Sequence, residues 1–136
     1  MSKKSSKKKL FSEDYELHVS AKMLYPYIQS AVGLADWVAD KVTVDHEKTY
    51  TFEWENEKHK ATISSQRINH SVRFTYLPES INDKKDPSYL EFRIEVNEIT
   101  QSTYLKILDY SDFDDMVELS ELWSANIEKL KSIIGG

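Results

Sequence analysis

The sequence of 136 residues contains no cysteine, and it has only three glycines and three prolines. Without cysteine there is no disulfide, no thiolate metal site and no cysteine nucleophile. Two of the glycines are the last two residues, so the chain lacks a glycine-rich phosphate-binding loop. No apolar run approaches the ~20 residues of a membrane-spanning helix. We therefore expect no membrane span and a cytoplasmic location.

The usual catalytic and metal-binding motifs are also missing. There is no GxSxG sequence and no pair of histidines four residues apart on a helix. The acidic run "DYSDFDDMVE" (109–118) has no central glycine, which favours a helix start over a calcium loop. We expect no metal, no cofactor and no identifiable catalytic residue, and an enzyme is the less favoured interpretation.

Charge divides the chain into two parts. The segment 1–9 holds five of the 18 basic residues and no acid, so the remainder has 13 basic and 23 acidic residues, a net charge of −10. We expect a disordered lysine-rich tail over 1–9 and one folded domain over 10–136. An acidic domain does not suit a phosphate backbone, so no nucleic-acid partner is expected.

Near the start of the chain, apolar and polar residues first alternate, and a helical pattern then follows. Residues 11–21 ("FSEDYELHVSA") have the period of a half-buried strand. Two short helices are predicted next, in 21–30 and 34–40, with a break at Gly33.

From 41 to 110 the apolar period is two, which predicts an antiparallel meander. We expect strands at 42–44, 49–55, 58–66, 69–77, 89–96 and 102–110, with an exposed loop at 78–88. Hairpin spacing places Trp54, His59 and Tyr76 in one row, and Ser65, on the apolar face, opposite His70. The last strand is ambiguous, because apolar residues occur in both registers.

The C-terminal segment from 111 has the pattern of a long amphipathic helix. Ser111 or Asp112 would cap its start, and Gly135 would cap its end. A helix of about 20 residues is about 30 Å long and could lie diagonally across the sheet.

This order predicts an α+β fold in which a curved antiparallel sheet wraps around a long C-terminal helix. The segment "SAKMLYPYIQSAVGLADWVADKV" (20–42) resembles the START-like (helix-grip) superfamily. Its Leu24-Tyr25 pair, followed by Gly33-Leu34-Ala35, Trp37 and Asp40, is similar to the branch that includes the activator of the Hsp90 ATPase. The resemblance spans 10–135 and is closest to small single-domain bacterial members.

The resemblance implies a cavity between the sheet and the long helix. Two alternatives remain open: the bulky side chains that face it either line a pocket or fill the core. The candidate ligand-binding residues are Leu34, Trp37, Tyr50, Phe52, Trp54, His59, Ile63, Phe74, Tyr76, Phe92, Ile94, Leu105, Leu119, Trp123, Asn126 and Ile127.

Three functions are compatible with this interpretation. The first is binding of a small apolar ligand, oriented by His59, Tyr76 or Asn126, with entry near the short helices and the 78–88 loop. The second is a co-chaperone-like protein-interaction domain with a filled core. The third is an enzyme acting on an aromatic or polyketide-like substrate. We expect a monomer, although the sequence does not determine the oligomeric state.

Overall fold

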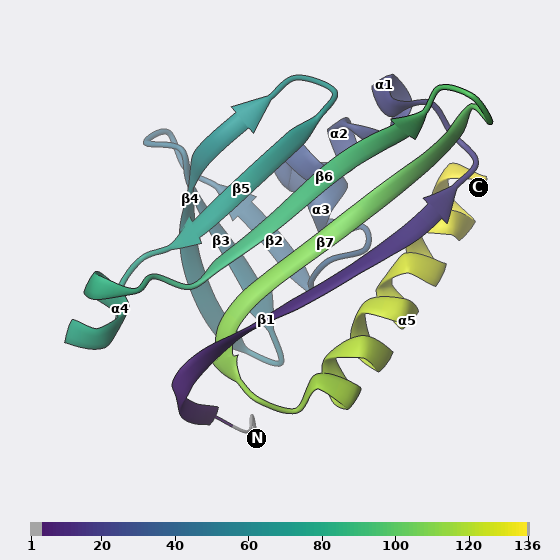
Figure 1. Ribbon diagram of the computed structural model, residues 1–136. Helices are drawn as coiled ribbons and strands as arrows, with labels where there is room; N and C mark the ends of the chain where they lie inside the picture. The colour runs from purple at the N-terminus through teal and green to yellow at the C-terminus, as the bar shows by residue number, and fades with distance from the viewer. Residues whose placement is uncertain (1–3, 136) are drawn as a thin grey trace.

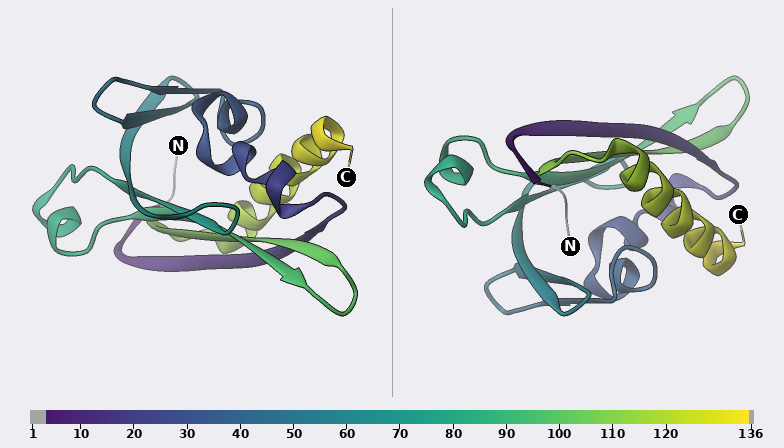
Figure 2. Two further views of the ribbon diagram at one scale, coloured as in Figure 1. Left: turned by 90° about the horizontal axis from the view of Figure 1, so that it is seen from above. Right: turned by 90° about the horizontal axis from the view of Figure 1, so that it is seen from below.

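The computed structural model describes residues 4–135, with side chains from residue 7 onward. One seven-stranded antiparallel sheet curls around a long helix (Figures 1 and 2), in the order β1-β7-β6-β5-β4-β3-β2. The strands are β1 (Lys4–Leu17), β2 (Lys41–Val44), β3 (Thr49–Trp54), β4 (Glu57–Arg67), β5 (Ser71–Tyr76), β6 (Tyr89–Asn97) and β7 (Ser102–Phe113). The helices are α1 (Ala21–Leu24), α2 (Pro26–Gln29), α3 (Ala31–Ala35), α4 (Ile81–Lys85) and α5 (Met116–Ile134). The α+β helix-grip prediction is confirmed.

The predicted meander is present from β2 to β7, and each strand pairs with the next. Glu55 and Asn56 both have positive φ, the conformation of a two-residue hairpin turn between β3 and β4. A bulge between Ile63 and Ser65 changes the register of β4. As a result Ser65 pairs with Arg73 and is exposed, and the prediction that it lies opposite His70 is wrong.

β1 begins at Lys4, within the segment for which we expected disorder, while residues 1–3 lie outside the described chain. Lys9 pairs with Ser111 of β7. The Lys8 ammonium lies 3.0 Å from a carboxylate oxygen of Asp83, and its side chain is only 6% exposed. The long aliphatic stems of lysine can be buried while the charge finds a partner, which explains how this sequence becomes an edge strand.

Three short helices follow β1, where we predicted two. Pro26 occupies the first turn of α2, and the Ser30 hydroxyl accepts a hydrogen bond from the Gly33 N–H at the start of α3. Gly33 is therefore inside a helix and not at a hinge. A Cβ atom there would lie 2.4 Å from the Pro26 carbonyl oxygen, so close packing requires this glycine.

The long helix starts later than predicted, because β7 continues to Phe113. Asp115 caps α5 by accepting a hydrogen bond from the Glu118 N–H at 3.0 Å, so Ser111 and Asp112 are not its caps. Gly135 ends the helix in the left-handed conformation, as predicted. The inner face of α5 buries Leu119, Trp123, Asn126, Ile127 and Leu130.

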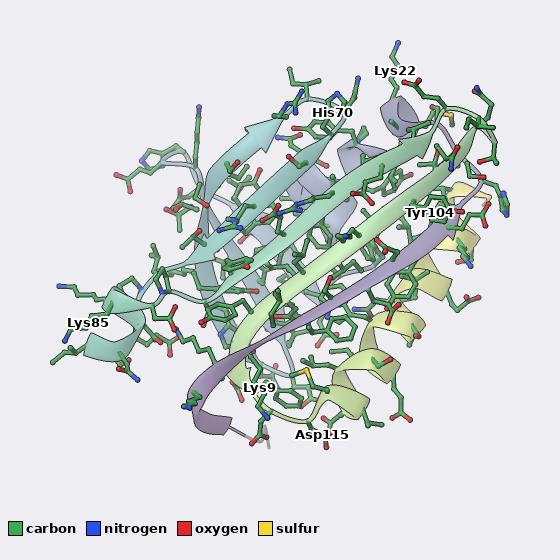
Figure 3. All side chains as sticks on the ribbon, in the orientation of Figure 1. Lys9, Lys22, His70, Lys85, Tyr104 and Asp115 are labelled. Carbon is green, nitrogen blue, oxygen red and sulfur yellow. The ribbon has the colours of Figure 1, made fainter. Side chains whose placement is uncertain are left out.

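The 78–88 segment is more ordered than a plain loop. It contains α4, which Ser80 caps by accepting a hydrogen bond from the Asp83 N–H. Lys85 projects from α4 at the far side of the molecule from the C-terminus (Figure 3). Over the described residues, no helix has both the length and the apolar character of a membrane crossing.

Candidate functional site

Most of the predicted ligand-binding residues are buried together between the sheet and α5. Twelve of the sixteen are fully buried: Leu34, Trp37, Tyr50, Phe52, Phe74, Phe92, Ile94, Leu105, Leu119, Trp123, Asn126 and Ile127. Trp37, on the segment after α3, contacts both Phe92 of β6 and Trp123 of α5, with ring centroids 5.4 and 6.1 Å apart. The short helices therefore close one end of the core.

Several buried polar groups in this set are used to hold elements together. The Tyr50 hydroxyl donates to the Gln29 carbonyl at 2.7 Å. The Trp54 indole and the Asn126 amide both donate to the Val38 carbonyl, at 2.9 and 3.4 Å. These bonds anchor α2 and the segment after α3 against β3 and α5, so Asn126 has a structural partner.

Of the four remaining predicted residues, Trp54, His59 and Tyr76 lie where β3 and β5 end and β4 begins, and Ile63 lies in the middle of β4. Trp54, His59, Ile63 and Tyr76 are only half-buried. The His59 ring lies 5.6 Å from the Trp54 ring and 6.2 Å from the Tyr76 ring. The structure thus brings the predicted row together, although the direct cross-strand partner of His59 is Phe52.

Asp109 completes this end of the interior and is absent from the residues that the sequence pattern selects. It pairs with Phe11 of β1 and Leu90 of β6, both buried on the inner face. Residues that are directly opposite share a face, so Asp109 also faces inward. The Trp123 indole N–H donates to its carboxylate at 3.0 Å.

Burial perturbs both ionisable groups here. It raises the pKa of Asp109 to about 6, despite the opposing hydrogen bond from Trp123. Burial also raises the pKa of Tyr76 strongly, and the negative charge of Asp109 adds to this effect. In the sheet, Leu90 of β6 lies between Asp109 and Phe74 of β5, and Phe74 is two residues before Tyr76. We call Trp54, His59, Tyr76, Asp109 and Trp123 the inner acidic end.

The inner acidic end offers unused polar groups beside an apolar core. Among residues 7–135 the Tyr76 hydroxyl has no hydrogen-bond partner, and Asp109 has no cationic partner. The same residues contain no group of three or more His, Asp or Glu arranged for a metal ion. The arrangement can orient a polar group of a ligand through one acid and one phenol.

Two hollows lie elsewhere, on the outside of the molecule. One of about 390 Å³ is lined by Lys7, Lys8, Asn82, Lys85, Asp86 and Tyr110. The other, of about 640 Å³, lies between the end of β1, the start of α1 and the β6–β7 turn, and includes His18. His70 is exposed in the turn between β4 and β5 (Figure 3). Neither hollow reaches the inner acidic end.

Comparison with known proteins identifies the fold family. Among solved structures, BfR322 from Bacteroides fragilis is 34% identical, with 94% of this chain and 92% of that chain covered and a TM-score of 0.59. The Aha1 dimer from Colwellia psychrerythraea has 15% identity, 90% and 93% coverage and a TM-score of 0.70. MLL2253 from Mesorhizobium loti has 13% identity, 93% and 97% coverage and a TM-score of 0.71.

At such low identity, the Aha1 and MLL2253 structures show a shared fold only. No protein with a curated function matches the chain. The family model described as a START-like superfamily domain matches residues 4–136. With the curled sheet, the long C-terminal helix and the relative from Bacteroides fragilis, this match means that the chain belongs to the START-like superfamily.

Proposed function

We propose that this domain binds a small, largely apolar ligand at the inner acidic end, between the sheet and the first turns of α5. The observation that carries the proposal is the contrast along the inner face. Its middle is filled by fully buried rings, whereas Tyr76 and Asp109 keep accessible surface and unused hydrogen-bonding capacity. A ligand would therefore enter beside the β3–β4 turn and α4, not beside α1 and α2.

Burial of apolar ligand surface would supply most of the affinity, at about 25 cal/mol per Å². Trp54 and Ile63 offer apolar surface for this contact, since both are half-buried and pack against the core. Tyr76 and Asp109 would then orient the ligand's polar group. None of these residues forms a nucleophile with a placed base, so binding is favoured over catalysis.

The three indole N–H groups provide a test by NMR. We expect titration with a short alkyl ligand to shift the indole signals of Trp54 and Trp123, which contact the inner acidic end. Trp37 is 1% exposed and its indole N–H donates to the Tyr27 carbonyl at 2.9 Å, so its signal should move least and serves as the internal control. Unchanged signals throughout, or a shift confined to Trp37, would contradict the proposal.

A second candidate is a protein-interaction domain, which the filled middle of the core favours. Large apolar side chains are exposed on α1 and on the β4–β5 and β6–β7 turns: Met23, Ile68 and Ile99, of which Ile99 is 94% exposed. Because the similar Aha1 from Colwellia psychrerythraea is a dimer in solution, a second copy of this chain is the first partner to test. We would expect sedimentation to show a dimer that is lost in the Ile68→Ser, Ile99→Ser double variant; a monomer at every concentration would count against self-association.

A further inference from the structure

We propose that the ligand of the inner acidic end carries a protonated amine, and that Asp109 is the residue that binds it. This inference rests on the proposed function and adds the chemical class of the ligand. It starts from a carboxylate that the fold places inside an apolar environment without a counter-ion.

The surroundings of Asp109 supply one hydrogen bond and no positive charge. Its neighbours in the sheet are Phe11 and Leu90, and Trp123 donates to one carboxylate oxygen. Among residues 7–135, no lysine, arginine or histidine forms an ion pair with it. A carboxylate that is partly desolvated and lacks a cation is costly unless a ligand supplies the missing charge.

The second group at this end also favours an amine over other donors. The Tyr76 oxygen can accept a hydrogen bond, and Asp109 keeps a second carboxylate oxygen for another. An ammonium group has three N–H donors, which suits an end of the core with two acceptors. A neutral alcohol has one donor, and a carboxylic acid would bring a like charge at neutral pH.

Aromatic rings complete the recognition of a cation. Tyr76, His59 and Trp54 form a continuous row of rings, with neighbouring centroids 6.2 and 5.6 Å apart. Ring faces attract cations and also pack against the methylene groups of an alkyl chain. The row can therefore receive the apolar part of an amine whose charged end reaches Asp109.

Other ionisable groups close to the acid do not change this preference. Tyr76 is neutral at physiological pH, as an ordinary tyrosine is, and burial raises its pKa further. The imidazole of His59 lies beyond Tyr76 and faces the Glu57 carboxylate, with 3.7 Å between the nearest nitrogen and oxygen. Asp109 is thus the group whose charge decides between cationic and neutral ligands.

The experiment compares four probes with the same chain length: octylamine, octyltrimethylammonium, octanol and octanoate. Binding to the whole chain at pH 7.5 is measured by calorimetry and by tryptophan fluorescence. We expect octylamine to bind at least tenfold more tightly than octanol, and octanoate to bind most weakly. The affinity of octyltrimethylammonium should lie between those of octylamine and octanol, because this probe retains the positive charge but lacks the N–H donors.

Two variants locate the effect. Asp109→Asn should reduce octylamine affinity at least tenfold and leave octanol affinity within about threefold, because the amide still accepts the bond from Trp123. Asp14→Asn removes the same charge from an exposed carboxylate on β1, which is 51% exposed, and should change nothing.

Each outcome decides one of the two proposals. If octanol binds as well as octylamine and Asp109→Asn has no effect, the amine inference is overturned and the proposed function stands. An amine preference that Asp14→Asn weakens as much as Asp109→Asn would also overturn it, because general surface charge would then explain the binding. If no probe binds, the proposed function fails and the inference with it.

Discussion

Glu91 and Asp109 are acidic residues on adjacent strands that point to opposite faces of one sheet. Leu90 pairs with Asp109, so the next residue, Glu91, faces outward. Glu91 is 6% exposed and accepts hydrogen bonds from the Nε atoms of Arg73 and Arg93, at 2.6 and 2.5 Å. Asp109 has one bond, from a neutral indole.

The electrostatic consequences are opposite. Burial pushes the pKa of Glu91 up, but the hydrogen bonds and charges of the two arginines outweigh this, and the pKa is lowered. For Asp109, burial prevails and the pKa rises to about 6. The outer carboxylate is stabilised within the chain, whereas the inner one is left for something the chain does not contain. Groups destabilised in this way are typical of binding sites.

The largest expected effect is the pH dependence of stability that Asp109 introduces. Its folded form keeps the proton to about pH 6, whereas the unfolded chain releases it near 3.8, so the folded state binds more protons in this window. The free energy of unfolding should therefore fall as pH rises from about 4 to 6 and stay lower above. Relative to wild type, Asp109→Asn should gain about 2 to 3 kcal/mol between pH 4 and pH 7.5.

Urea denaturation of both proteins across this range would measure that gain. The comparison requires that the wild type be free of bound ligand, since an amine would hide the cost of the charge. If the stability difference between Asp109→Asn and wild type did not change with pH, Asp109 would be well solvated in the folded protein. The contrast with Glu91 would then disappear.

Neutralising Glu91 on the outer face should destabilise the protein. Glu91→Gln removes the charge that both arginines share, and it should lower the free energy of unfolding by about 2 kcal/mol at pH 7. We keep the value at this level because Arg73 and Arg93 are 35% and 44% exposed, so water replaces part of the lost interaction. The loss should shrink as pH falls below the ordinary pKa of glutamate, near 4.5, because the unfolded wild type then takes up a proton before the folded form does.

Thermal unfolding of Glu91→Gln at pH 7 and pH 3.5 provides the measurement. If its deficit were equal at both pH values, lost packing and not lost charge pairing would be the cause. Together the two variants should show opposite signs at neutral pH, which is the simplest expression of the difference between the two carboxylates.

The sheet and the long helix are predictable because apolar periodicity indicates which face is buried. The same rule also covers Asp109, since it shares parity with Leu105 and Ile107 on β7, both buried. The predicted strand 102–110 includes Asp109, but apolar residues occur in both of its registers and the acidic run from 109 favours a helix start, so the pattern does not select Asp109 as an interior residue. At the junction of a strand and a helix, the local preference for a helix start competes with pairing to a neighbouring strand. Here pairing with β1 prevails and extends β7.

Other differences come from features that a single sequence does not encode locally. The bulge in β4 turns Ser65 outward, and no glycine or proline marks it. The start of β1 depends on Asp83, 75 positions from Lys8 in sequence, which binds the Lys8 ammonium. Gly33 resembles a hinge because glycine often breaks helices. The structure instead requires glycine at this position because a Cβ atom would lie too close to the Pro26 carbonyl oxygen. In each case the deciding contact is not visible from neighbouring residues.

The smallest expected effects concern two tyrosine hydroxyls that mirror the two carboxylates. The Tyr110 hydroxyl, toward the outer face, donates to the Asp86 carboxylate at 2.8 Å, whereas Tyr76 has no such partner among residues 7–135. Tyr110→Phe should therefore lower the free energy of unfolding slightly, whereas Tyr76→Phe should change it by less than about 0.5 kcal/mol. Stability would be measured by urea denaturation at pH 7, with octylamine affinity as the second measurement.

Tyr76→Phe should weaken octylamine binding about threefold, since it removes one of two acceptors, while Tyr110→Phe should leave that affinity unchanged. A clear stability loss in Tyr76→Phe would mean that the hydroxyl already has a partner within the fold, and that this end of the core is closed in the same way as the other.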